Sequence, residues 1–93
     1  MISTFKDKHL ENCYEFGNCR RIKQDLVRRV LRKLEILDAA TCLDDLRSPP
    51  GNRLHGLEGD RAKEHAIAVN GPWRITFEFQ DGNAYNVALE QYH

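Results

Sequence analysis

Apolar positions recur every three or four residues in the first half of the chain and every second residue in the last third. The first pattern is typical of helices with one buried face, and the second of strands with one buried face. We therefore expect a strand at residues 2–5, a helix at 8–16 ended by Gly17-Asn18, and a turn or short helix at 38–46. Between them lies the clearest helix, whose apolar stripe consists of Ile22, Leu26, Val27, Val30, Leu31, Leu34 and Leu37.

A proline- and glycine-rich segment, residues 48–52, separates this helical half from a series of expected strands. Strands are expected at residues 52–57, 65–69, 73–79 and 84–92, with hairpin turns at Asn70-Gly71 and Asp81-Gly82. Helices followed by an antiparallel meander indicate an α+β fold. We expect a single domain, residues 1–93, in which an N-terminal strand and helices pack on one face of a mainly antiparallel sheet of four to five strands.

The strand at 73–79 has the most regular alternation in the chain. Trp73, Ile75, Phe77 and Phe79 would face the helices, and Arg74, Thr76 and Glu78 would face the open side of the sheet. Neighbouring strands bring their own outward residues beside an outward residue. The alternation therefore predicts an arginine on the open face, within reach of other strands.

The formal net charge is zero, but the charges are unevenly distributed. One segment is strongly basic and carries Arg20, Arg21, Lys23, Arg28, Arg29, Arg32 and Lys33 against the single acid Asp25. A neutral total therefore does not exclude a polyanionic partner, and this basic face is either solvated or an RNA-docking surface. The chain has no apolar run long enough to span a bilayer and no apolar leader segment, which predicts a cytoplasmic protein without a membrane partner.

The three cysteines, Cys13, Cys19 and Cys42, are odd in number and form no CxxC motif. Disulfide frameworks usually have even counts at close spacing, so we expect three reduced and mostly buried thiols. His9 and Cys13 lie four residues apart, but a zinc site needs four ligands in paired spacing. No metal and no cofactor are expected.

Two histidines and one arginine could meet on the open face of the sheet. Arg74 lies on the strand 73–79, His55 on the strand 52–57, and His93 at the end of the last strand. Metal-free ribonucleases use these groups as a base for the 2′-OH, a cation for the phosphorane and an acid for the leaving oxygen. The alternative for Arg74 is an exposed strand residue that forms a salt bridge with Glu78 or Glu90.

The strings GNRLHGLEGDRA, VNGPWRITFEFQDGNAYNV and the terminal QYH resemble those of HigB toxins, in the RelE/ParE superfamily. The resemblance covers nearly the whole chain and implies a RelE-like fold. It also implies a ribosome-dependent mRNA endonuclease that cuts in the A site by 2′-OH attack. Its implied partners are a HigA-type helix-turn-helix antitoxin, the 70S ribosome with its 16S rRNA, and mRNA. Operator DNA would be contacted only through the antitoxin.

The resemblance also implies roles for individual residues. Arg74 would stabilise the transition state, His93 would be the general acid, and Tyr92 would position RNA. His55 would be a base or a substrate anchor, and Arg61 would contact backbone phosphate or brace the sheet. The other expected RNA contacts are Arg53, Lys63 and Gln91.

Two positions depart from the family pattern, and both fall among these residues. HigB toxins usually have LKGD where this chain has Leu57-Glu58-Gly59-Asp60, and an acid where it has Gln91. A glutamate beside RNA repels phosphate, so we expect an attenuated toxin, although Glu58 could instead accept the 2′-OH proton. The alternatives are a catalytically weak or inactive antitoxin-binding regulator and a ParE-like gyrase inhibitor, against which the terminal Tyr-His argues.

Overall fold

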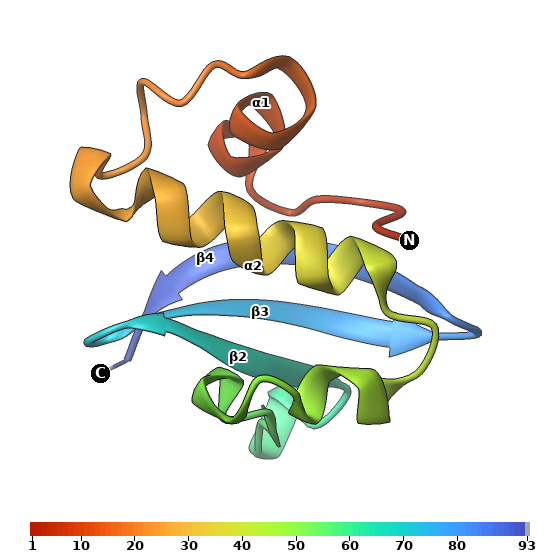
Figure 1. The fold of residues 1–93 in the computed structure, drawn as a ribbon. Coiled ribbons are helices and arrows are strands. Elements are labelled where there is room, and N and C mark those ends of the chain that lie inside the picture. Colours follow the sequence, from red (N-terminus) through yellow and green to blue (C-terminus); the bar gives the residue numbers. More distant parts are fainter. Residues whose placement is uncertain (93) are drawn as a thin grey trace.

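The computed structural model describes residues 1–92, which fold into two helices above a four-stranded sheet (Figure 1). The helices are α1 (Lys8–Phe16) and α2 (Val27–Ala39), and the strands are β1 (His55–Gly56), β2 (Glu64–Asn70), β3 (Trp73–Gln80) and β4 (Asn83–Gln91). All neighbouring strands are antiparallel, in the order β1-β2-β3-β4. Helix α2 lies across one face of the sheet and α1 packs on its far side. The expected α+β architecture is confirmed.

The first helix has the bounds that its sequence predicts, because both of its caps are local. The carboxylate of Asp7 accepts hydrogen bonds from the backbone N–H groups of His9 and Leu10, at 3.0 and 3.2 Å. Gly17 ends the helix in the left-handed conformation, at φ 73°, which glycine adopts without a side-chain clash. The second helix begins later than expected, because residues 24–26 form a short 3-10 turn before Val27.

The expected N-terminal strand is present only as two isolated bridges. Ile2 pairs with Ala84 and Phe5 with Val87, both parallel to β4, at the edge of the sheet opposite β1. The carboxylate of Asp38, at the end of α2, accepts a 2.7 Å hydrogen bond from the backbone N–H of Ile2. This segment therefore lengthens the sheet by one irregular edge.

The core lies between α2 and the sheet. The helix contributes Val30, Leu34 and Leu37, and the central strands contribute Ile67, Ile75 and Phe77, all with 0% exposure. Burying side chains of this size stabilises the fold by roughly 1.5–3 kcal/mol each. The apolar stripe of the helix and the apolar alternation of β3 thus meet as the sequence predicted.

Three local expectations need correction. The strand expected at 52–57 has only the two residues of β1, because fully buried Asn52 is held by the Lys33 side chain and by the carbonyls of Leu46 and Ser48. The first hairpin turns at residues 71–72, one position late, since Asn70 still belongs to β2. Thr76, expected on the open face, has 0% exposure because side chains cover it.

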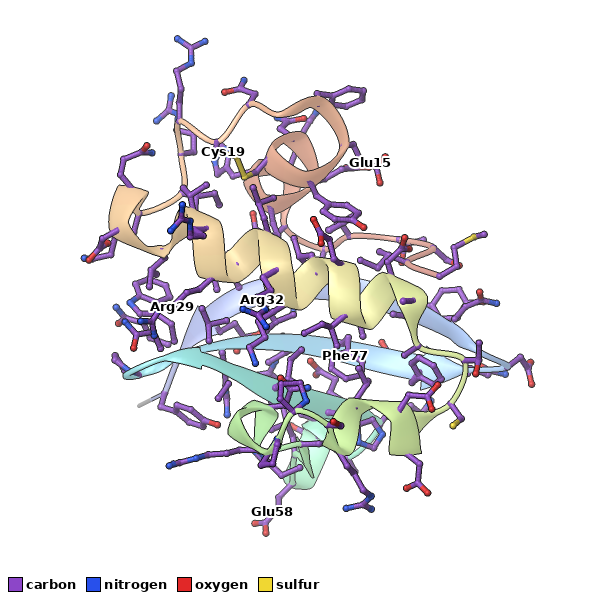
Figure 2. The ribbon with its side chains drawn as sticks, viewed as in Figure 1. Glu15, Cys19, Arg29, Arg32, Glu58 and Phe77 are labelled. Carbon is purple, nitrogen blue, oxygen red and sulfur yellow. A yellow bond between two sulfur atoms is a disulfide. The ribbon has the colours of Figure 1, made fainter. Side chains whose placement is uncertain are left out.

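The expectation of three reduced thiols was wrong. Cys13 and Cys19 form a disulfide that ties α1 to the loop before α2, and Cys42 is free and exposed. The yellow bond beside the Cys19 label marks it in Figure 2. Counting cysteines cannot detect one bridge with one thiol left over, because pairing depends on where the chain returns after Gly17.

Candidate active site on the open face of the sheet

The register of the strands decides which residues share the open face. Arg74 lies opposite Ala68 on β2 and Glu90 on β4, so these three form one row across the sheet. Thr76 lies opposite Ala66 and Ala88, and Ala66 in turn lies opposite His55 on β1. Residues directly opposite each other in antiparallel strands project to the same face. Arg74 and Thr76 therefore share this face with two small alanines of β2, of which Ala66 is fully buried.

Arg74, Tyr92 and His55 come together at one end of this face. The guanidinium carbon of Arg74 lies 4.3 Å from the centroid of the Tyr92 ring, a cation–π geometry. The hydroxyl of Tyr92 lies 3.4 Å from Nε2 of His55, and the two rings are stacked with centroids 6.1 Å apart. Three of the residues that the sequence nominated for catalysis are therefore neighbours.

The contacts of His55 determine which of its two ring nitrogens carries the proton. Nδ1 lies 2.9 Å from the carbonyl oxygen of Arg53. A carbonyl can only accept a hydrogen bond, so Nδ1 carries the proton and donates it. In the neutral ring Nε2 then has the lone pair, which accepts the 3.4 Å hydrogen bond from the Tyr92 hydroxyl.

A carboxylate network lies beneath Arg74. The guanidinium of Arg61 donates to both oxygens of Glu64, at 2.7 and 2.8 Å, and to both oxygens of Glu90, at 2.6 and 2.9 Å. The hydroxyl of Thr76 donates to Glu90 at 2.8 Å. The hydrogen bonds from Arg61, with a further one from Thr76, lower the pKa of Glu90 to about 2. The hydrogen bonds from Arg61 also lower the pKa of Glu64, and the two carboxylates in turn raise the pKa of Arg61.

Arg74 itself is incompletely paired. Its Nη2 lies 3.7 Å from Glu90 Oε1, which is an ion pair but too long for a hydrogen bond. Its Nε is buried, and among residues 1–92 no atom accepts a hydrogen bond from it. The side chain is only 14% exposed. A mostly buried guanidinium with unused donors is suited to bind an oxyanion that enters from solvent.

The other residues nominated for RNA contact lie in three separate places. Arg53 and Tyr92 line one hollow of about 470 Å³ together with Gly51 and the end of β2. Lys63 lies elsewhere, in a separate hollow of about 480 Å³ with Glu78 and Tyr85. Gln91 is exposed and pairs with Trp73, so strand alternation directs it to the opposite face from Tyr92.

Glu58 is exposed and points away from the body of the molecule (Figure 2). Its carboxylate makes no hydrogen bond or ion pair with the other residues of the described chain. His93 lies outside the described residues. The expected roles of both therefore remain predictions.

The basic face of α2 is continuous with the hollow at Tyr92. Arg28, Arg29, Arg32 and Lys33 line a neighbouring hollow of about 490 Å³, and Gly51 and Val69 belong to both hollows. Arg29 and Arg32 project from α2 in Figure 2, and Arg29 donates a 3.1 Å hydrogen bond to the side chain of Asn70. A track of positive charge therefore leads from the helix toward Arg74.

Sequence reasoning overlooked Glu64 and Thr76 and treated Glu90 only as a possible salt-bridge partner. Glu90 does pair with Arg74, but its hydrogen bonds come from Thr76 and from Arg61, 29 residues earlier. The available signal was one acidic or hydroxyl residue on each of three neighbouring strands: Glu64 on β2, Thr76 on β3 and Glu90 on β4. Within residues 1–92, no group of three His, Cys, Asp or Glu side chains is placed to hold a metal ion. No helix in this part of the chain is long and apolar enough to cross a membrane.

Comparison with known proteins gives these features a context. Residues 3–93 match the family described as RelE-like toxin of type II toxin-antitoxin system HigB. The chain is 45% identical over 91 residues to Toxin HigB-1 of Vibrio cholerae, which covers 97% of this chain and 96% of that protein. It is 38% identical over 93 residues to Endoribonuclease HigB of Proteus vulgaris, covering 100% of both. An uncharacterized protein of Haemophilus influenzae is 32% identical over 87 residues, 92% of this chain and 86% of that one.

The motifs on which the sequence resemblance rested fall within the matched residues, on the segment before β2, on β2, β3 and β4, and at Tyr92 after β4, while His93 lies outside the described residues. The chain therefore belongs to the HigB-like family of RelE-like toxins of type II toxin–antitoxin systems.

Proposed function

We propose that this chain is an endoribonuclease that cleaves mRNA in the ribosomal A site without a metal ion. The 2′-OH attacks the neighbouring phosphate, and the products are a 2′,3′-cyclic phosphate and a 5′-OH. The observation that carries the proposal is the guanidinium of Arg74, mostly buried against Tyr92 with its Nε unpaired among residues 1–92 and His55 beside it. The Endoribonuclease HigB name of the Proteus vulgaris relative supports the same chemistry.

Each of the described side chains has a role that its contacts favour, and His93, which lies outside the described residues, takes its role from the family resemblance. Arg74 donates to the non-bridging oxygens as negative charge accumulates on the phosphorane, which is where a preorganised cation lowers the barrier. His55 is the base that takes the 2′-OH proton at Nε2, because Nδ1 is engaged by the Arg53 carbonyl. Tyr92 positions the RNA and holds Arg74. His93 is the general acid for the leaving oxygen.

The track of positive charge along α2 supports docking to RNA of the ribosome. Arg28, Arg29 and Arg32 are exposed, and phosphate contacts supply most of the affinity of such surfaces. The chain as a whole has zero net charge, so the residues outside this basic segment are net negative, and this face is the route by which a polyanion is attracted. The toxin acts in the cytoplasm, where a HigA-type helix-turn-helix antitoxin neutralises it. The complex contacts operator DNA through the antitoxin.

The experiment is cleavage of mRNA on programmed 70S ribosomes by the purified protein. Arg74→Ala should lower the rate by about 10²–10³ because it removes transition-state charge stabilisation. His55→Ala and His93→Ala should each lower it by about 10²–10⁴ because a proton-transfer group is lost. The matched control is His9→Ala, an exposed histidine on α1, which should leave the rate unchanged.

The second candidate is an antitoxin-binding regulator with little or no catalysis. It is favoured by one observation, the ion pair that Arg74 already makes with Glu90 at 3.7 Å. A folded, antitoxin-binding protein that makes no codon-positioned cuts even in large excess would select the regulator. Inhibition of DNA gyrase without RNA cleavage would instead select a ParE-like function.

A further inference from the structure

The carboxylate of Glu90 has little remaining capacity to accept hydrogen bonds. Oε2 accepts from Arg61 at 2.6 Å and from Thr76 at 2.8 Å, and Oε1 accepts from Arg61 at 2.9 Å. The Thr76 hydroxyl is fully buried, so it fixes the carboxylate from below. Glu90 is thus held by groups other than Arg74, although Arg74 lies directly opposite it on β3.

As a result, Arg74 has hydrogen-bond donors that no acceptor among residues 1–92 uses. An arginine beside a free carboxylate normally forms two short, parallel hydrogen bonds with it. Here the nearest nitrogen of Arg74 stays 3.7 Å from Glu90, and its Nε has no acceptor among residues 1–92. The ring of Tyr92 holds the guanidinium in place without using any of its N–H groups.

We propose that Arg61 and Glu90 form a positioning pair that keeps Arg74 available to the scissile phosphate. Arg61 occupies the carboxylate that would otherwise capture Arg74, and it acts through Glu90 rather than by touching RNA. This inference rests on the proposed function and assigns Arg61 to one of its two expected roles. Most of the N–H donors of Arg61 are already used by Glu64 and Glu90, which leaves little for a phosphate.

The two carboxylates bound by Arg61 differ in one respect that makes the idea testable. Both accept a pair of hydrogen bonds from Arg61, and both are largely removed from solvent, with side chains 18% exposed for Glu64 and 25% for Glu90. Only Glu90 forms an ion pair with Arg74. Loss of Arg61 frees both carboxylates, but only Glu90 can then take Arg74 away from the substrate.

The test compares four proteins for mRNA cleavage on programmed ribosomes: wild type, Arg61→Gln, Arg61→Gln/Glu90→Gln and Arg61→Gln/Glu64→Gln. Arg61→Gln should lower the turnover rate by about 10²-fold, as loss of an oxyanion donor does. The turnover rate of the Glu90→Gln double variant should be at least tenfold higher than that of Arg61→Gln. The turnover rate of the Glu64→Gln double variant should stay as low as that of Arg61→Gln. If Arg61→Gln does not fold, the two charge-matched double variants are compared directly.

A role limited to folding predicts a different pattern, because removal of either carboxylate relieves the unpaired charge equally. Equal recovery in the two double variants would overturn the proposal, and so would wild-type turnover in Arg61→Gln. Thermal unfolding of all four proteins shows whether differences in rate follow differences in stability.

A second readout does not depend on cleavage. The Nε–H signal of Arg74, identified by its loss in Arg74→Lys, is followed by NMR during titration with inorganic phosphate. The signal should respond at lower phosphate concentration in wild type and the Glu90→Gln double variant than in the Glu64→Gln double variant. If wild type makes no cuts, the proposed nuclease function fails, and this titration alone decides the inference. The same midpoint in all proteins would overturn it.

Discussion

The guanidinium carbon of Arg74 lies over the ring of Tyr92, 4.3 Å from its centroid. Tyr92 follows the last residue of β4, and its backbone N–H donates a 2.7 Å hydrogen bond to the carbonyl of Pro72. That bond fixes the position of the ring at the mouth of the β2–β3 hairpin. Two residues 18 positions apart in the sequence are thereby held in one geometry, and among residues 1–92 no acceptor takes a hydrogen bond from the cation, which leaves its donors for an anion.

Substitutions at Tyr92 should separate its ring from its hydroxyl. Tyr92→Phe keeps the surface under Arg74 and loses only the 3.4 Å contact with His55, so cleavage should fall by a few-fold at most. Tyr92→Leu removes the cation–π contact, which is worth about 0.5–1 kcal/mol or more when desolvated. The cleavage rate of this variant should therefore fall further, by about tenfold. Single-turnover cleavage rates on programmed ribosomes measure both. Equal losses in the two variants would mean that the hydroxyl, and not the ring, matters.

Glu58→Lys should make the toxin stronger. It places a cation where the resembling family pattern has one, and it removes a negative charge from a segment that we expect to lie near RNA. Because Glu58 is exposed, its charge acts through solvent, and the gain should be a few-fold and should shrink as salt is raised. Cleavage rates at two ionic strengths measure it, with Glu58→Gln as the intermediate. A fall in rate in Glu58→Gln would instead support a role for this carboxylate as the base.

The carboxylate network predicts a loss of stability in acid. Hydrogen bonds from Arg61 and Thr76 hold the pKa of Glu90 at about 2, below its ordinary value of 4.5. The unfolded chain therefore takes up this proton first as the pH falls, and the stabilisation is fully present above about 4.5 and lost on the way to about 2. Urea unfolding midpoints between pH 6 and 2.5 should fall less steeply in Glu90→Gln than in wild type. Glu58→Gln, which removes an exposed carboxylate, should retain the wild-type slope.

Reduction of the disulfide should destabilise the protein moderately. The bridge joins Cys13 and Cys19 across a sequence separation of 6, and closing so short a loop is worth about 2 kcal/mol in chain entropy. Urea unfolding with and without a thiol reductant should show a loss of that order. The Cys42→Ser variant should lose the same amount of stability as wild type when the reductant is added, because Cys42 takes no part in the bridge. A variant with both Cys13→Ser and Cys19→Ser should be insensitive to the reductant.

Several features of this fold could be predicted from sequence because their causes are local. Helix α1 ends where predicted, since Asp7 and Gly17 cap it within one turn. The turn at Asp81-Gly82 formed as predicted, with both residues at positive φ, 53° and 80°. The alternation of β3 correctly identified the apolar side, where Ile75 and Phe77 have 0% exposure.

The polar side of the sheet could not be predicted in the same way. Alternation placed Thr76 in solvent, but Arg61 and Glu90 cover it, and their own meeting depends on the segment before β2 folding back over the sheet. The extent of β1 and the bridge between Cys13 and Cys19 likewise depend on distant or returning chain. No periodicity records such contacts, because each is set by the register of two segments rather than by either one.

The sequence by itself therefore determined the helices, the main strands, the apolar core and, through its motifs, the toxin family. Those properties follow from periodicity, capping and short characteristic sequence strings within contiguous residues. Only the tertiary structure decided that Arg61 engages two carboxylates and that Arg74, beside Tyr92 and His55, has an Nε without an acceptor among the described residues. The physical reason is that hydrogen-bond capacity is shared among all groups that meet in space, and which groups meet is settled when the strands pair.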